Sequence, residues 1–177
     1  MLLSFKLNIN MTTKITFKKK FVPINNVSPL RYPGGKTRAR KILDEILSQY
    51  ININEFSYII SPFFGGGSFE FYLQNKYNVF IIANDKFTPL YNFWNQAKIN
   101  KTSLITTLKP YLHTVTKNNF LLYRNTIMSL DNPLTQALYY FIINRCSFSG
   151  STLSGGFSQQ SSQKRFTMSS INRIENL

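Results

Sequence analysis

The stretch Phe56-Ser-Tyr-Ile-Ile-Ser-Pro-Phe-Phe-Gly-Gly-Gly-Ser68 decides the fold of this chain. It opens with an apolar run, residues 56–60, which is rich in strand-forming residues and stops just before Pro62. Residues 62–68, here called the glycine loop, follow at once, and residues 68–76 carry an apolar stripe at helical spacing. A strand that runs through a glycine loop into a helix is typical of the opening unit of a parallel α/β sheet.

The same alternation continues after the glycine loop. Residues 78–83 form a second buried strand with Asp85 at its end, and Thr88-Pro89 opens a further helix. We therefore predict an α/β fold, the first half of a Rossmann-like sheet, with a cofactor-binding half-domain over residues 28–99. It is expected to start with an amphipathic helix around residues 38–50, whose apolar residues point inward and whose Asp44 lies on the surface.

The flanking regions have different patterns. Residues 1–27 are a basic leader without acids, expected to be loosely ordered and to touch phosphates if anything. Residues 100–177 are predicted to be a helical region, with one helix near residues 120–128 and another that starts at Asn132-Pro133. The Ser/Gly/Gln-rich tail from Ser147 onward is predicted to be a loop that ends in a short basic stretch.

Charge and composition narrow the function classes. Lys and Arg number 21 against 7 acids, which gives a formal net charge of +14 and favours a polyanionic partner such as nucleic acid over a merely solvated basic surface. A single Cys and a single His exclude an internal disulfide and a Cys–His metal cluster, so we expect an intracellular protein without a metal. No apolar run approaches the roughly 20 residues of a membrane span. Met11 could equally be the translation start.

The glycines indicate where a ligand would bind. The eight glycines fall in three places: residues 34–35, residues 65–67, and Gly150 with residues 155–156. The middle cluster joins a strand to a helix, where a doubly wound sheet receives its cofactor. Asp85 lies about 20 residues further on, where a carboxylate accepts hydrogen bonds from ribose hydroxyls. The sequence thus favours a nucleotide-like cofactor, and the alternative is a turn followed by a capping Asp.

Four segments carry a resemblance to a known family. Pro62-Phe-Phe-Gly-Gly-Gly-Ser68 resembles the Pro-Phe-x-Gly-x-Gly-Ser loop of the Dam-like class of DNA adenine methyltransferases. Leu30-Arg-Tyr-Pro-Gly-Gly-Lys36 is similar to that family's N-terminal motif, and Ile82-Ala-Asn-Asp85 with Tyr91-Asn92 to its ribose-binding segment. Phe141-Ile-Ile-Asn-Arg-Cys-Ser-Phe-Ser-Gly150, leading to Gly155-Gly-Phe-Ser158, is similar to its Asn-Arg-x-x-Phe-x-Gly segment, which begins the DNA-contacting region in relatives. The resemblance spans roughly residues 28–166.

The resemblance implies a cofactor, a substrate and a set of site residues. The cofactor would be S-adenosylmethionine, without a metal, and the substrate would be adenine in double-stranded DNA. Cofactor binding would fall to Tyr32, Gly34, Lys36, Pro62, Phe63, Gly65, Gly67, Ser68 and Asp85. DNA contact is expected from Asn144, Arg145, Ser149, Lys164 and Arg165. For Arg145 a structural ion pair or hydrogen bond is an equal alternative.

Two departures from the family pattern qualify this expectation. Relatives commonly carry an acid immediately before Pro62, where this chain has Ser61. The seven prolines are never adjacent, so the catalytic Asp-Pro-Pro-Tyr motif, which accepts the adenine amino hydrogens of a flipped base, is absent. No residue of this chain is therefore assigned a catalytic role.

We predict the N-terminal half of an adenine-specific methyltransferase, truncated or split from a second polypeptide that carries the rest, and inactive alone. A non-catalytic nucleic-acid-binding remnant and an RNA substrate are the alternatives.

Overall fold

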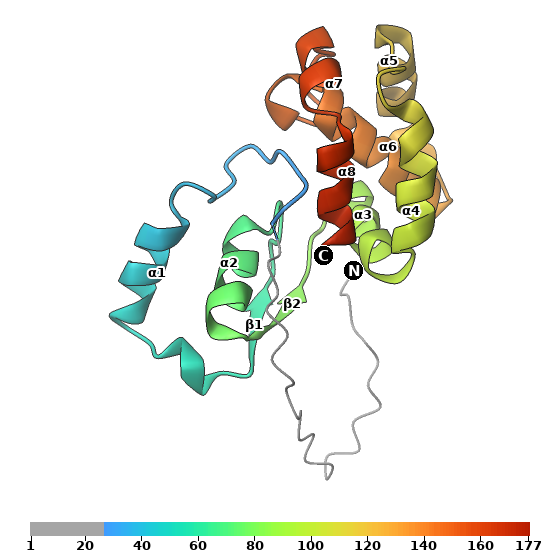
Figure 1. The fold of residues 1–177 in the computed structure, drawn as a ribbon. Helices are drawn as coiled ribbons and strands as arrows, with labels where there is room; N and C mark the ends of the chain where they lie inside the picture. Colours follow the sequence, from blue (N-terminus) through green and yellow to red (C-terminus); the bar gives the residue numbers. More distant parts are fainter. Residues whose placement is uncertain (1–26) are drawn as a thin grey trace, which may run out of the picture.

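The computed structural model describes residues 27–177, which form an α/β part and a helical part (Figure 1). The predicted leader, apart from Val27, lies outside the described residues. The α/β part contains α1 (Arg40–Ser48), a 3-10 turn (Ile53–Glu55), β1 (Tyr58–Ser61), α2 (Ser68–Tyr77) and β2 (Phe80–Ala83). The helical part contains α3 (Thr88–Ile99), α4 (Lys101–Leu108), α5 (Lys117–Thr126), α6 (Pro133–Cys146), α7 (Gln159–Lys164) and α8 (Met168–Glu175).

The predicted strand–helix–strand unit is present. Strands β1 and β2 pair in parallel, with Tyr58 opposite Phe80 and Ser61 opposite Ala83, and α2 connects them. Side chains alternate across a strand, so the two faces of this sheet differ. Ile59 packs against the small core beneath α2, whereas Ile60 on the opposite face is 60% exposed.

One face of the sheet exposes apolar side chains. It includes Tyr58, Ile60 and Ile82, which are all exposed. Parallel sheets are normally covered on both faces, and two strands alone bury little apolar surface. Within residues 27–177 no other strand pairs with β1 or β2, so both edges of this two-stranded sheet are free of further strands.

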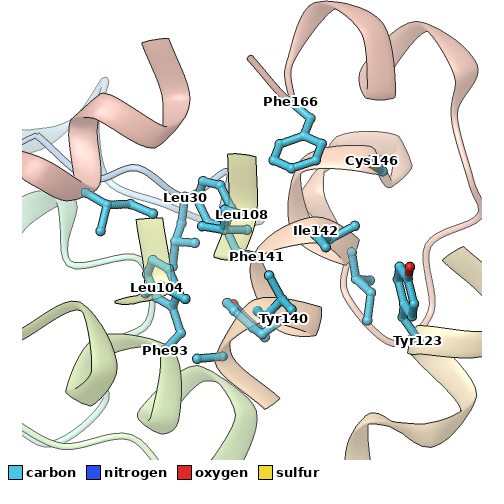
Figure 2. Packing of buried hydrophobic residues seen from close by; sticks show 14 of the residues in the cluster. Leu30, Phe93, Leu104, Leu108, Tyr123, Tyr140, Phe141, Ile142, Cys146 and Phe166 are labelled. Carbon is cyan, nitrogen blue, oxygen red and sulfur yellow. The ribbon is translucent and has the colours of Figure 1, made fainter. Parts of the chain in front are cut away.

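The helical part holds most of the core. Figure 2 shows how α6 carries Tyr140, Phe141 and Ile142 into the centre of this part, where Phe93 from α3 meets them. The rings of Phe93 and Phe141 stack with their centroids 5.5 Å apart. Helix α3, which the sequence pattern groups with the strands, therefore contributes its buried face to the helical core and joins the two parts.

Helices α5 and α6 arise where the sequence predicts them. Thr116 caps α5 with a capping box, and the side chain of Asn132 caps α6, where Pro133 fits the first turn because its missing N–H needs no partner there.

The prediction of a loop from Ser147 onward was wrong, because α7 and α8 occupy that stretch. Ser158 caps α7, Thr167 forms a capping box at α8, and Ile171 and Ile174 are fully buried. The high Ser and Gln content of this stretch indicated a loop, whereas tertiary packing stabilises helices there.

The prediction for α1 was also wrong in its orientation. Ile42 and Ile46 are exposed, whereas Asp44, predicted on the surface, is 2% exposed. Its carboxylate accepts hydrogen bonds from the hydroxyls of Tyr72 and Tyr77 and from the Lys76 ammonium, all on α2. Burial acts to raise the pKa of Asp44, but the bonds from Lys76 and the two tyrosines outweigh it and lower this pKa. The buried Asp44 carboxylate thus joins α1 to α2.

Replacing Asp44 by asparagine is expected to lower the free energy of unfolding by about 1.5–3 kcal/mol at pH 7, because a hydrogen-bonded charge is removed. The pKa of Asp44 is depressed in the folded state. The stabilisation is therefore complete above the unfolded value of about 3.9 and is lost as the pH falls through the folded value. Urea titrations at pH 7 and at about pH 3 should show the difference from wild type shrinking in acid. Glu45→Gln, at the exposed neighbouring position, should change little; an equal loss there would contradict the assignment.

Candidate cofactor and nucleic-acid site

The glycine loop connects β1 to α2 and is held by the end of β2. The Phe64 N–H donates to the Asn84 carbonyl at 2.8 Å, and the Asn84 side chain donates to the Pro62 carbonyl at 3.0 Å. The Gly67 N–H then closes a turn onto the Phe64 carbonyl at 2.9 Å. The loop therefore lies at the carboxyl ends of both parallel strands, as its sequence position predicts.

Asp85 is the acid that the glycine loop contacts. One of its carboxylate oxygens accepts the Gly65 N–H at 2.8 Å, and the other accepts the Phe87 N–H at 3.0 Å. Each carboxylate oxygen has two lone pairs, so both atoms can accept a further hydrogen bond. The sequence places Asp85 at the end of the next strand, and the structure adds a direct hydrogen bond between it and the glycine loop.

Trp94 is a contact of the glycine loop that the sequence pattern did not single out. Its indole Nε1–H donates to the Gly65 carbonyl at 2.9 Å, and its ring packs edge-on against Phe64 and Phe71.

The glycines of the loop are required by the chain's own aromatic rings. Gly65 and Gly67 have φ angles of 51° and 64°, a region that glycine adopts without strain. A Cβ atom at Gly66 would lie 2.7 Å from the Cβ of Tyr32, and one at Gly67 would lie 2.5 Å from the Phe64 ring. Tyr32, on the N-terminal motif, thus lies directly on the glycine loop.

The N-terminal motif folds onto the start of α2. The Lys36 N–H donates to the Ser68 hydroxyl at 3.0 Å, and the Lys36 ammonium donates to the Gly34 carbonyl at 2.9 Å. Partial burial and the negative charge of Asp85 raise the pKa of Tyr32. The structure therefore brings together all the residues predicted for cofactor binding except Phe63, whose side chain is 87% exposed.

Ser61 stands before Pro62, where the family resemblance leads one to expect an acid. A neighbouring acid contacts this serine. The Ser61 hydroxyl donates to the Glu70 carboxylate at 2.7 Å, and Ser61 is buried. A carboxylate is thus present at the end of β1 although it comes from α2.

Tyr32 lines two cavities. The larger, about 270 Å³, is lined by Tyr32, Pro33, Phe87, Tyr140 and residues 150–153. The smaller, about 140 Å³, is bordered by Gly66 and Ser68 on the glycine-loop side and by Arg40 and Arg173. Tyr32 therefore contributes to both an aromatic cavity and a basic one.

The predicted DNA contacts divide into buried and exposed residues. Asn144 and Arg145 are 0% and 7% exposed, so neither offers a free surface, and the structure favours the hydrogen-bond alternative for Arg145. Its guanidinium donates to the carbonyls of Arg165 and Pro29, and burial with three neighbouring arginines lowers its pKa to about 10. Ser149, Lys164 and Arg165 are exposed.

Two further classes of site were searched for in the described part of the chain. Among residues 27–177 no cluster of three or more His, Cys, Asp or Glu side chains could hold a metal ion. No helix within the same residues is long and apolar enough to cross a membrane.

The fold and site define a class of protein: a parallel strand–glycine loop–helix unit, with an acid at the neighbouring strand end, joined to a basic helical part. The family model of D12 class N6 adenine-specific DNA methyltransferases matches residues 32–177, and the chain belongs to this family. The resemblance inferred from the four sequence segments is thereby confirmed. A search among curated proteins finds no relative of this chain.

Proposed function

We propose that the glycine loop, Asp85 and residues 32–36 bind S-adenosylmethionine, and that the chain is the cofactor-binding and partial DNA-recognition half of an adenine methyltransferase acting on double-stranded DNA. The observation that carries this proposal is the bond from the Gly65 N–H to the Asp85 carboxylate, which fixes an acid at the glycine loop. A DNA substrate would also place the protein inside the cell.

The residues present fit the proposed cofactor. Asp85 retains lone pairs for ribose hydroxyls, and the amino end of α2 has no side-chain cap to compete with a carboxylate there. The Oδ1 atom of Asn84, beside Asp85, is buried without a hydrogen-bond partner among the described residues, an acceptor that a ligand donor could satisfy after a local shift. Tyr32 contributes an aromatic side chain to the lining of both cavities.

Each of these groups would have a limited task. When bound, S-adenosylmethionine supplies a methyl group on a positively charged sulfur. Asp85 would accept the ribose hydroxyls, Tyr32 and Lys36 would enclose the ligand, and Ser68 at the start of α2 would face its carboxylate. None of these residues removes a proton from the adenine amino group, and no residue of this chain is proposed to do so.

The proposed DNA interface is confined to exposed residues. Ser149, Lys164 and Arg165 lie on the segment between α6 and α8 and are available to phosphates and base edges. The net charge of +14 favours such a polyanion. Asn144 and Arg145 are no longer proposed as direct contacts, because their donors are engaged within the chain.

The Asp-Pro-Pro-Tyr segment does not occur in the 177 residues. We propose that a further polypeptide, in the same protein or in a partner, supplies this segment together with strands and helices that cover the exposed face of β1 and β2. The apolar residues on that face support the proposal, because a sheet surface of this kind is stabilised by being covered.

Calorimetric titration of the folded chain with S-adenosylmethionine tests cofactor binding. A saturable heat with one site, abolished by prior saturation with S-adenosylhomocysteine, is expected. A protein that is folded by circular dichroism yet gives no binding heat would contradict the proposal.

One observation favours a second function, a nucleic-acid-binding remnant without cofactor. The Tyr32 ring already fills the space above Gly65 and Gly66, so the glycines need no ligand to explain them. That titration and a parallel one with duplex DNA separate the two functions: DNA binding without any S-adenosylmethionine heat would favour the remnant.

The 177-residue chain alone is expected to transfer no methyl group to unmethylated duplex DNA, because it lacks the segment that accepts the adenine amino hydrogens. Transfer of radiolabelled methyl groups to DNA is the measurement, with a complete family member as the positive control. Turnover by the pure chain would contradict the proposed division of roles.

A further inference from the structure

Asn144 pairs with the main chain of a residue 113 positions away. Its Oδ1 accepts the Arg31 N–H at 3.0 Å, and its Nδ2 donates to the Arg31 carbonyl at 2.7 Å. The same Nδ2 donates to the Gly150 carbonyl at 3.0 Å. Asn144 is fully buried, so one amide side chain takes both main-chain groups of Arg31 in a site closed to water.

Other groups hold the same segment against the helical part. The Arg31 guanidinium donates to the Ser147 carbonyl at 3.3 Å and to the Ser161 hydroxyl at 3.2 Å. A Cβ atom at Gly150 would lie 2.2 Å from the Arg31 carbonyl oxygen, so this glycine permits the close approach. Residues at the end of α6 and the start of α7 thus hold residues 29–31 in place.

The residue that follows Arg31 lies on the glycine loop. Tyr32 contacts Gly65 and Gly66, and the Gly65 carbonyl accepts the indole N–H of Trp94. A continuous path of contacts therefore runs from Asn144 through Arg31 and Tyr32 to the glycine loop.

We infer that Asn144 is a positioning residue, which sets the place of Tyr32 on the glycine loop and so ties the helical recognition region to the cofactor pocket. Neither the family match nor the resemblance assigns it this role, and the sequence analysis expected it to contact DNA. The effect on the ligand rests on the proposed function, whereas the effect on Tyr32 and the glycine loop does not.

Trp94 supplies a readout that does not depend on any ligand. It is the only tryptophan in the chain, so its indole N–H gives one assignable NMR resonance. Because this N–H donates to the Gly65 carbonyl, its chemical shift reports displacement of the loop on which Tyr32 lies.

The principal variant is Asn144→Asp, which keeps the acceptor for the Arg31 N–H but turns an oxygen toward the carbonyls of Arg31 and Gly150. We expect it to shift the Trp94 indole resonance and the amide resonances of Gly65 and Gly66. If the cofactor proposal also holds, its affinity for S-adenosylmethionine should fall about 5-fold or more.

Two matched pairs make the test independent of general destabilisation. Ser161→Ala removes a partner of the Arg31 guanidinium, whereas Ser162→Ala removes a hydroxyl that is equally buried in α7 but bonds to the Gln159 carbonyl. Gly150→Ala drives a methyl group into Arg31, whereas Gly156→Ala meets no atom within 4 Å. The first member of each pair should shift the Trp94 resonance, and the second should not.

The outcomes separate the two proposals. Shifts in Asn144→Asp, Ser161→Ala and Gly150→Ala, with unchanged controls, support the positioning role even if no S-adenosylmethionine binds. If the folded Asn144→Asp variant keeps the wild-type resonances, the role is wrong. Should that variant fail to fold, Ser161→Ala decides in the same way, and an unshifted resonance there contradicts the inference.

Discussion

Phe93→Ala is expected to lower the free energy of unfolding by about 3–5 kcal/mol, the cost of removing a large ring from a closed core. Phe93 is fully buried, stacks on Phe141 at 5.5 Å and meets Tyr140 at 5.8 Å, so truncation would leave a cavity where α3 crosses α6. Urea denaturation followed by circular dichroism gives the value. The large effect follows from the loss of this stacked, fully buried ring.

The control for this change is Leu122→Ala on α5, where the side chain is 56% exposed and the loss should stay within about 0.5 kcal/mol. A loss below about 1.5 kcal/mol for Phe93→Ala would contradict the packing described for α3 and α6.

Gly67→Ala is the second large expected effect, a loss of roughly 2–5 kcal/mol in the free energy of unfolding. Its φ angle of 64° is unfavourable for a residue with a Cβ atom, and the new methyl group would lie 2.5 Å from the Phe64 ring. The Phe64 ring packs against Phe71 and Trp94 and has little room to yield.

Thermal unfolding of Gly67→Ala and of Gly156→Ala measures this difference, since the second glycine has open space around it. Equal stability of the two variants would contradict the close approach of Phe64 to the glycine loop. The new methyl group should also push the Phe64 ring away from Trp94. Greater exposure of Trp94 to water would then shift its fluorescence to longer wavelength.

The sequence signals around the glycine loop are local. A short apolar run, three consecutive glycines and an acid at the next strand end are each readable within a few residues, whereas the bond from the Gly65 N–H to Asp85 is seen only in the structure. The helix start at Asn132-Pro133 was equally readable, because a capping side chain and a proline at the first turn act locally.

The sequence did not predict the interactions that span the chain. Asn144 pairs with Arg31 across 113 positions, and no periodicity marks such a partner. Asp44 was misplaced for the same reason, because its partners lie on α2 and helical spacing alone cannot show which face of α1 they will cover. Polar groups were assigned to solvent or ligand by default, whereas the structure uses them to join its two parts.

Because Asn144 and Arg145 are buried, other residues are expected to recognise the DNA sequence. Asn144 and Arg145 bond to the chain's own carbonyls, so the DNA contact that we propose falls to the exposed residues Ser149, Lys164 and Arg165. Replacement of an exposed residue should alter DNA affinity without moving the glycine loop.

The most direct test of the central claim compares wild type, Asp85→Asn and Asp131→Asn in calorimetric titrations with S-adenosylmethionine. Both variants lose one acid, but only Asp85 contacts the glycine loop, and Asp131 is an exposed residue ahead of α6. We predict that wild type and Asp131→Asn bind alike and that Asp85→Asn binds at least about tenfold more weakly, the loss of about 1.4 kcal/mol or more expected for a charged acceptor. Equal binding by all three folded proteins would contradict the claim that Asp85 and the glycine loop hold the cofactor.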